Sequence, residues 1–187
     1  MHDFLEILKR KPIVAALCKE SDLDDLCLSN VKMAVVLCGN IRTIPEIVRR
    51  IRDAKIYPFI HIDFIDGLST SGAAVDFVKC YTCADGIVTT KVNQIKRANE
   101  LKLASIHRFF VWDRISQDNI EHQMAHTHAD VVEVLPGVIP SVIEGLSQKK
   151  KIPLIVGGFV NTQKDVELAL QNGADAVTTS IVNLWFV

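Results

Sequence analysis

Residues 153–180 read PLIVGGFVNTQKDVELALQNGADAVTTS, two short apolar runs separated by a segment with helical spacing. The runs lie at residues 153–156 and 176–179. Between them, apolar residues recur three and four positions apart until Gly173. Glycine commonly closes a helix because it tolerates a left-handed backbone. The stretch therefore predicts a strand, a helix and a second, parallel strand.

The same alternation runs through the rest of the chain. Amphipathic segments such as TIPEIVRRIRDAK (residues 43–55) separate the apolar runs. Apolar strands between helices are typical of a parallel sheet, and eight such units close most naturally into a barrel. We predict an α/β fold, a minimal (β/α)8 TIM barrel of parallel strands with outer helices, as a single domain over residues 1–187. An open doubly wound sheet is the alternative. The eight candidate strands are residues 13–17, 33–37, 58–63, 86–89, 104–110, 131–134, 153–156 and 176–179.

Composition narrows the class of protein. The chain has 187 residues, 49% of them hydrophobic, and a formal net charge of -1. No apolar run approaches the roughly 20 residues of a membrane span, and the start of the chain lacks the features of a secretory signal. Five scattered cysteines do not suggest a disulfide framework. We expect a cytoplasmic protein with reduced thiols, no membrane contact and no cofactor; the sequence does not indicate its oligomeric state.

Four polar side chains fall on predicted strands where aliphatic residues would be usual. In FIHIDF (residues 59–64), alternation gives His61 and Asp63 one face of the strand while isoleucines take the other. The same alternation places Arg108 and Glu133 inside the barrel. Binding sites of such barrels lie at the carboxyl ends of the strands, so we expect these four side chains to share the barrel mouth.

Three interpretations of this cluster remain open. Asp63, Arg108 and Glu133 could form an ion network that only stabilises the barrel, because buried charges must be paired. They could instead bind a polar ligand, which we favour. A metal held by His61, Asp63 and Glu133 is the third alternative, because these ligand types suit magnesium, manganese or zinc; we assign no metal.

A second set of residues predicts a phosphate site. Gly157 and Gly158 follow strand seven, where the absence of side chains lets backbone N–H groups approach a ligand. Thr178, Thr179 and Ser180 end strand eight and are expected to begin a short helix whose N-terminus would favour an anion. The loops after strands seven and eight often bind phosphate in such barrels. A tight turn and a helix cap without ligand are the alternative.

Six motifs carry a resemblance to a known family: HIDFIDGL (61–68), DGIVTTK (85–91), IHRFFVWD (106–113), DVVEVLPGVIPSVI (130–143), IPLIVGGFVNTQKDVELAL (152–170) and NGADAVTTSIVNLW (172–185). In these motifs, their order and their spacing, the chain resembles the glycerol-3-phosphate responsive antiterminators of bacterial glycerol uptake operons. The resemblance implies a small barrel that binds glycerol 3-phosphate. It also implies that the loaded protein stabilises an antiterminated form of a leader mRNA, so that it is a regulator rather than an enzyme.

The residues themselves say little about RNA. Basic side chains cluster at Arg49, Arg50 and Arg52 and again from Lys91, and these are candidate RNA contacts. Each cluster is equally typical of a solvated helix face. The aromatic residues occupy core-like positions, so we expect no platform on which bases could stack. The RNA partner therefore rests on the resemblance. The alternative is a small barrel enzyme acting on a phosphorylated substrate, with Asp63 or Glu133 as general acid or base and Arg108 as an electrostatic clamp.

Two histidines have the spacing of metal ligands. His122 and His126 are one helical turn apart in EHQMAHTHAD (residues 121–130). The segment precedes strand six, so it should lie near the amino end of that strand, away from the mouth. We therefore assign no metal to this pair.

Overall fold

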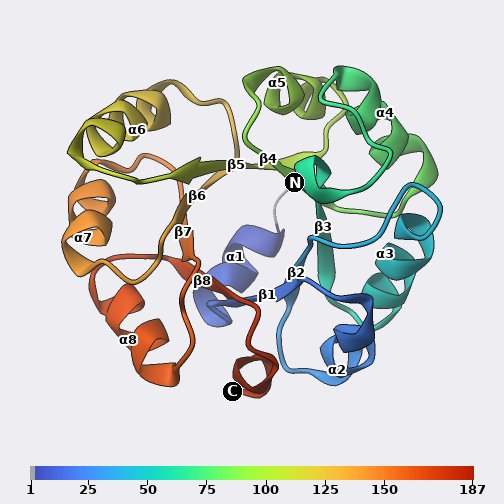
Figure 1. Ribbon diagram of the computed structural model, residues 1–187, viewed down its shortest axis with the longest axis horizontal. Helices are drawn as coiled ribbons and strands as arrows, with labels where there is room; N and C mark the ends of the chain where they lie inside the picture. Colours follow the sequence, from blue (N-terminus) through green and yellow to red (C-terminus); the bar gives the residue numbers. More distant parts are fainter. Residues whose placement is uncertain (1–2) are drawn as a thin grey trace.

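The computed structural model describes residues 3–187, with the side chain of Asp3 excepted. Eight parallel strands close into a barrel in chain order, which confirms the predicted (β/α)8 fold over the open sheet (Figure 1). Four of the eight predicted strands, residues 13–17, 86–89, 104–110 and 176–179, have the bounds that the structure shows, and the other four differ by one or two residues at an end. The strands are β1 (Ile13–Leu17), β2 (Met33–Val36), β3 (Tyr57–His61), β4 (Gly86–Thr89), β5 (Ala104–Phe110), β6 (Val131–Leu135), β7 (Leu154–Gly157) and β8 (Ala176–Thr179).

Helices surround the barrel in the order of the chain (Figure 1). In α8, Gly173 follows the helix with a φ of 97°, the left-handed backbone that its sequence position predicted. The α-helices are α1 (Asp3–Arg10), α2 (Leu23–Leu28), α3 (Ile44–Asp53), α4 (Gly72–Tyr81), α5 (Val92–Glu100), α6 (Arg114–His126), α7 (Pro140–Lys149) and α8 (Gln163–Gln171), and the 3-10 helices are η1 (Glu20–Asp22), η2 (Ile62–Phe64) and η3 (Val182–Phe186).

Two of these elements lie outside the βα repeat. Helix α1 does not join the outer ring but lies across one end of the barrel (Figure 1). Its Phe4 and Leu8 are buried in the same core as Phe59 of β3, and the rings of Phe4 and Phe59 meet edge to face with centroids 5.3 Å apart. Because α1 leads directly into β1, the end that it closes is the amino end of the strands. The opposite, carboxyl end is left for binding.

The 3-10 helix η3 stands between α8 and α2, where an eighth outer helix would be expected (Figure 1). Its Trp185 is fully buried in the core between the strands and the outer helices. The Trp185 Nε1–H donates to the carbonyl oxygen of Thr179 at 2.9 Å. One aromatic side chain thus covers the strands that a longer helix covers elsewhere.

The predicted third strand was too long at its carboxyl end. It ends at His61, and the chain turns into η2 at Ile62. Ile62 and Ile65 are three residues apart, so a 3-10 turn places both on one side, and both are buried among the outer helices. This turn changes the direction of Asp63, which the strand alternation had placed inside the barrel.

Within residues 3–187, no helix combines the length and the apolar character needed to cross a membrane.

Candidate ligand site at the barrel mouth

A buried ion pair lies inside the barrel at its carboxyl end. Arg108 of β5 and Glu133 of β6 are paired residues of neighbouring strands. The Arg108 Nε–H donates to Glu133 Oε2 at 2.7 Å, and the two residues are only 4% and 1% exposed. The structure thus brings together two of the four predicted mouth residues, and strand alternation predicted their direction correctly.

Beside this ion pair is a small hollow of about 150 Å³, here called the mouth hollow. It lies among the ends of strands and the loops that follow them. Its lining residues are Ala16, Cys18, Leu37, Arg108, Glu133, Leu135, Gly158, Val160, Thr178, Thr179 and Ser180. Six of the predicted ligand residues thus surround one cavity, joined by apolar and thiol side chains that sequence reasoning missed. The alternation of inward-facing and outward-facing residues along β1 and β2 could have indicated several of these missed lining residues.

Unpartnered polar atoms distinguish this end of the barrel. Four buried side-chain atoms in the described part of the chain have no hydrogen-bond partner, and they belong to three inward-facing residues. They are both ring nitrogens of His61, Oε1 of Glu133 and Oγ1 of Thr178. Leaving such a group buried and unsatisfied costs about 1–3 kcal/mol. Their concentration at one place indicates a site completed by a ligand or by water.

His61 is held neutral by its surroundings. Burial, together with the nearby charge of Arg108, lowers the pKa of its imidazole to about 2. Its Nδ1 lies 3.9 Å from Asp63 Oδ2, which is too far for a hydrogen bond, and a neutral ring forms no ion pair. A neutral imidazole carries one donor and one acceptor nitrogen, so His61 can both donate to and accept from a bound hydroxyl group.

Asp63 does not join the ion pair, which corrects the predicted three-residue network. Its carboxylate is turned toward the loop after β4, where Oδ2 accepts hydrogen bonds from the backbone N–H and the hydroxyl of Thr90, at 3.0 and 3.2 Å. The third alternative was a metal held by His61, Asp63 and Glu133. Among the residues that the structure describes, no three His, Cys, Asp or Glu side chains are placed to hold a metal ion.

The glycine pair leaves space where side chains would intrude. A Cβ on Gly157 would lie 3.1 Å from Thr178 Cβ and 3.3 Å from Glu133 Oε1. Gly158 has a φ of 77°, and a Cβ there would lie 3.2 Å from a methyl group of Leu135. Both positions therefore favour glycine, and the backbone of β7 passes close to the free oxygen of Glu133.

The predicted helix at Thr178, Thr179 and Ser180 is different in the structure. The helix that follows is the five-residue η3, which begins two residues after Ser180. Thr179 Oγ1 donates to the carbonyl of Val160 and accepts from the N–H of Ile181. The expected row of free helix amides is therefore absent from this segment. Thr178, whose hydroxyl is buried without a partner, is the polar group of β8 that remains available.

The basic cluster on α3 is engaged in local ion pairs. Arg49 binds Glu46 and Asp53, at 2.6 and 2.7 Å. Arg50 pairs with Asp24, and Arg52 donates to Asp85 at 2.9 Å. Lys91 is exposed in the loop after β4, and the structure shows no carboxylate partner for it among residues 3–187. An RNA role for these four residues stays a prediction.

The expectation that the aromatic residues occupy core-like positions is wrong for three of them. Trp112 is 81% exposed, Phe159 77% and Phe64 53%. Each follows the carboxyl end of a strand, in loops where the apolar side chain has no core to enter. The rings of Phe110 and Trp112 stack, with centroids 5.5 Å apart and planes inclined by 16°. Sequence reasoning missed this because it assigned apolar residues near strand ends to the core.

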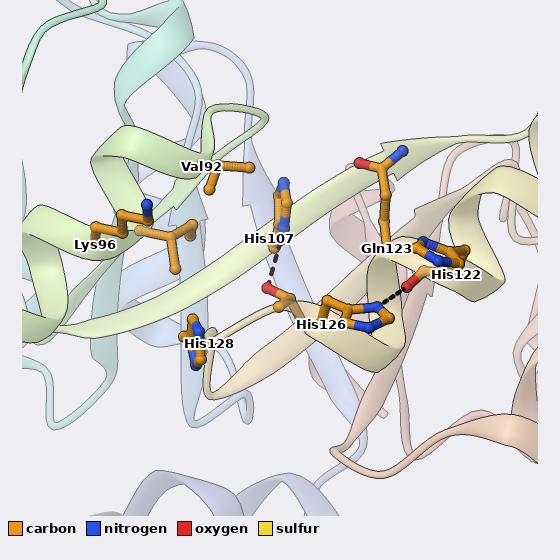
Figure 2. A pocket seen from close by; sticks show the side chains of 9 residues that line it. Val92, Lys96, His107, His122, Gln123, His126 and His128 are labelled. Atoms are coloured by element: carbon orange, nitrogen blue, oxygen red, sulfur yellow. Dashed lines mark hydrogen bonds between the residues drawn. The ribbon is translucent and has the colours of Figure 1, made fainter.

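A second hollow, of about 200 Å³, lies outside the barrel between α5 and α6 (Figure 2). His107, His122, His126 and His128 line it. The ring of His126 is already engaged, because its Nδ1 is hydrogen-bonded to the carbonyl of His122 at 2.8 Å, and His107 Nδ1 lies 3.1 Å from the Thr127 hydroxyl (Figure 2). The histidine pair thus has the spacing of metal ligands without a third ligand group in the described chain.

The fold and the mouth hollow define a class of protein, a small (β/α)8 barrel with a polar site beside a buried arginine at the carboxyl end of its strands. Within this class the chain belongs to the glycerol-3-phosphate responsive antiterminator family, which its sequence matches over residues 13–185. The family is a regulatory one. This confirms the predicted family and its regulatory rather than enzymatic character.

Individual relatives agree with this assignment. The chain is 37% identical over 181 residues to YgcP of Escherichia coli (strain K12), covering 97% of this chain and 95% of that protein. The solved glycerol uptake operon antiterminator regulatory protein from Listeria monocytogenes str. 4b F2365 is 29% identical, with a TM-score of 0.87 over 92% of this chain and 94% of that one. A glycerol uptake operon antiterminator-related protein from Thermotoga maritima MSB8 is 28% identical, with a TM-score of 0.82 and coverage of 94% and 98%. Aldolases that match at 16% identity or less share the fold alone.

Proposed function

We propose that the protein, acting as a single domain, binds glycerol 3-phosphate or a closely similar small phosphate in the mouth hollow. The loaded protein then binds the leader mRNA of a glycerol operon and stabilises its antiterminated form. Membership of the family supports both the kind of ligand and the RNA partner. Because such a regulator meets RNA during transcription, we place its action in the cytoplasm.

One observation carries the ligand site: the unpartnered buried atoms of Glu133 and Thr178 belong to residues that line the mouth hollow together with the buried Arg108. The guanidinium of Arg108 donates to Glu133 through Nε, and its two Nη atoms have no partner among residues 3–187. A guanidinium with free Nη groups suits a phosphate, because it can donate two parallel hydrogen bonds to it.

The remaining groups suit hydroxyls. Glu133 Oε1 can accept a hydrogen bond, and the hydroxyl of Thr178 can donate or accept one. Gly157 and Gly158 allow the ligand to approach the backbone of β7. Ser180 lines the mouth hollow and is exposed. A small molecule with one phosphate and two hydroxyl groups could bind both the guanidinium of Arg108 and the polar groups that suit hydroxyls.

The test is a thermal-shift titration with glycerol 3-phosphate, compared with glycerol and with inorganic phosphate at equal ionic strength. A ligand that binds only the folded state raises the melting temperature, and at 100 times its Kd it contributes about 2.7 kcal/mol of stability. We expect glycerol 3-phosphate to raise it more than either fragment.

A matched pair of variants makes the test specific. Thr178→Val removes a hydroxyl that has no partner, so the free protein should be at least as stable while the shift with glycerol 3-phosphate decreases. Thr89→Val is the control, because Thr89 is equally buried but its hydroxyl donates to Gln94 on the helix side of β4. It should lose stability and keep the shift. No stabilisation of the native protein by any phosphate at millimolar concentration, or an equal shift in Thr178→Val, would contradict the site.

A further inference from the structure

Exposed aromatic side chains gather at the same end of the barrel as the mouth hollow. Phe64 follows β3, Trp112 follows β5 and Phe159 follows β7, and all three are more than half exposed. Trp112 stacks on Phe110, and its large exposed area shows that the remainder of the indole is open. Exposed aromatic groups collected at one end of a protein are typical of an interaction surface.

A groove of about 370 Å³ lies beside this stack, here called the side groove. It is formed by the loops after β3 and β4 and by the end of β5. The rings of Phe64 and Phe110 line it, together with Lys91 and His61. His61 is 1% exposed, and neither ring nitrogen has a hydrogen-bond partner among the residues described. The side groove thus offers ring faces and an unpartnered group that can donate and accept.

These features match an unpaired nucleobase. Proteins recognise single-stranded RNA by stacking bases on aromatic rings and by hydrogen bonds to the base edges. Binding to a second protein chain would not require ring faces that are open for stacking. It would also not require a polar group at the bottom of the side groove. The family membership established above supplies RNA as the partner class.

The charges nearby favour the same partner. Lys91 and Arg114 are exposed at the edges of this surface, and within residues 3–187 neither forms an ion pair. The adjacent acids are engaged by the backbone: Asp63 accepts from the N–H of Thr90, and Asp113 accepts from the N–H of Ser116. This contrasts with α3, whose three arginines each have a carboxylate partner.

We propose that the side groove and the Phe110–Trp112 stack bind unpaired bases of the RNA, with Lys91 and Arg114 on its backbone phosphates. This inference rests on the proposed function and names its RNA-binding face. His61 lines the side groove, and the charge of Arg108 in the mouth hollow acts on His61. The RNA and the metabolite therefore occupy neighbouring positions at one end of the barrel, which gives the metabolite a direct route to influence RNA binding.

The two tryptophans allow a direct test. Trp112 is exposed and Trp185 is fully buried, so quenching of tryptophan fluorescence by RNA reports contact with Trp112. We would titrate the protein with single-stranded oligoribonucleotides of about 12 nucleotides, a length within the range of such sites, and with a glycerol-operon leader transcript, each with glycerol 3-phosphate present. We expect quenching that saturates with RNA and that Trp112→Phe abolishes.

Affinities measured by gel shift complete the test. Loss of one stacked base corresponds to about 5- to 150-fold in Kd, so Trp112→Ala should weaken binding within that range, while Trp112→Phe stays within a few-fold of the native protein. Lys91→Gln should lower the slope of log K against log salt by about one. Tyr81→Ala is the matched control: Tyr81 is exposed and stacks on Phe77, but it ends α4 at the opposite end of the barrel.

The outcomes separate this inference from the proposed function. RNA binding that Trp112→Ala and Tyr81→Ala leave equally unchanged would overturn the proposed face and leave the antiterminator function standing. Greater loss with Arg50→Gln than with Lys91→Gln would move the contact to α3. A native dimer that Trp112→Ala converts to monomer in sedimentation would make this surface a subunit interface. If no RNA binds although glycerol 3-phosphate does, the RNA half of the proposed function is overturned together with this inference.

Discussion

His61 lies on the inner wall of the barrel, where its charge state depends on folding. In the folded protein, burial and the charge of Arg108 lower its pKa to about 2, whereas in an unfolded chain a histidine titrates near 6.5. Between these two pH values the unfolded chain binds a proton that the folded protein does not bind. Stability must therefore rise with pH through this window and level off above about pH 6.5.

The contribution of His61 is measurable by urea denaturation at several pH values. From pH 5 to pH 7, a histidine that stays neutral in the folded state contributes an increase of about 2 kcal/mol in the free energy of unfolding. His61→Gln should reduce the measured increase by about that amount. His128→Gln, which removes an exposed imidazole, controls for the loss of one histidine. An unchanged pH dependence in His61→Gln would show that the side chain is not held neutral.

For single residues, strand alternation predicted the direction of a side chain correctly only within the observed strands. Alternation placed His61, Arg108 and Glu133 inside the barrel correctly, because each lies within an observed strand. It failed for Asp63, because β3 ends at His61 and the following turn obeys a different period. Hydrogen bonding to residues distant in sequence, such as that between Asp63 and Thr90, leaves no local pattern that alternation could detect.

Two elements that break the βα repeat complete the barrel. Helix α1 closes its amino end through Phe4 and Leu8, and their spacing of four residues is a helical signal that lies outside the repeated strand and helix pattern. The short helix expected to begin at residues 178–180 is the 3-10 helix η3, which begins at Val182. Its structure depends on Trp185, whose burial between β1 and β8 is a tertiary contact that periodicity over so few residues does not encode.

Trp185 therefore offers a prediction about η3. Trp185→Ala removes a fully buried ring and the hydrogen bond from Nε1 to the carbonyl of Thr179. Truncation of a buried tryptophan typically costs about 3–5 kcal/mol, and we expect urea denaturation to show a loss in that range. Phe186→Ala is the neighbouring control, because Phe186 is 43% exposed, and should cost much less. Similar losses for both variants would mean that η3 does not cover the barrel as described.

In the whole molecule, the helix that closes the barrel and the groups suited to binding lie at opposite ends of the strands. α1 closes the amino end, while the ion pair, the unpartnered polar atoms and the exposed rings of Phe64, Trp112 and Phe159 lie at the carboxyl end. The fold class followed from the sequence because the βα pattern repeats eight times, so that local errors in single elements did not alter it. The binding surface depends on which side chains the loops expose, and that arrangement appears only when all eight units meet.

This arrangement predicts reciprocal coupling between metabolite and RNA. If glycerol 3-phosphate tightens RNA binding by some factor, RNA must tighten glycerol 3-phosphate binding by the same factor, because both describe one coupling free energy. Gel shifts of a glycerol-operon leader RNA at several ligand concentrations give the first factor, and calorimetric titration of the ligand into protein with and without RNA gives the second. Typical couplings correspond to about 5- to 150-fold. The RNA affinity should also fall steeply with salt, because phosphate contacts dominate it. A joint variant that neutralises Arg49, Arg50 and Arg52 tests whether α3 shares in this dependence. RNA binding that is unaffected by glycerol 3-phosphate, although both bind, would contradict ligand-responsive antitermination by this protein.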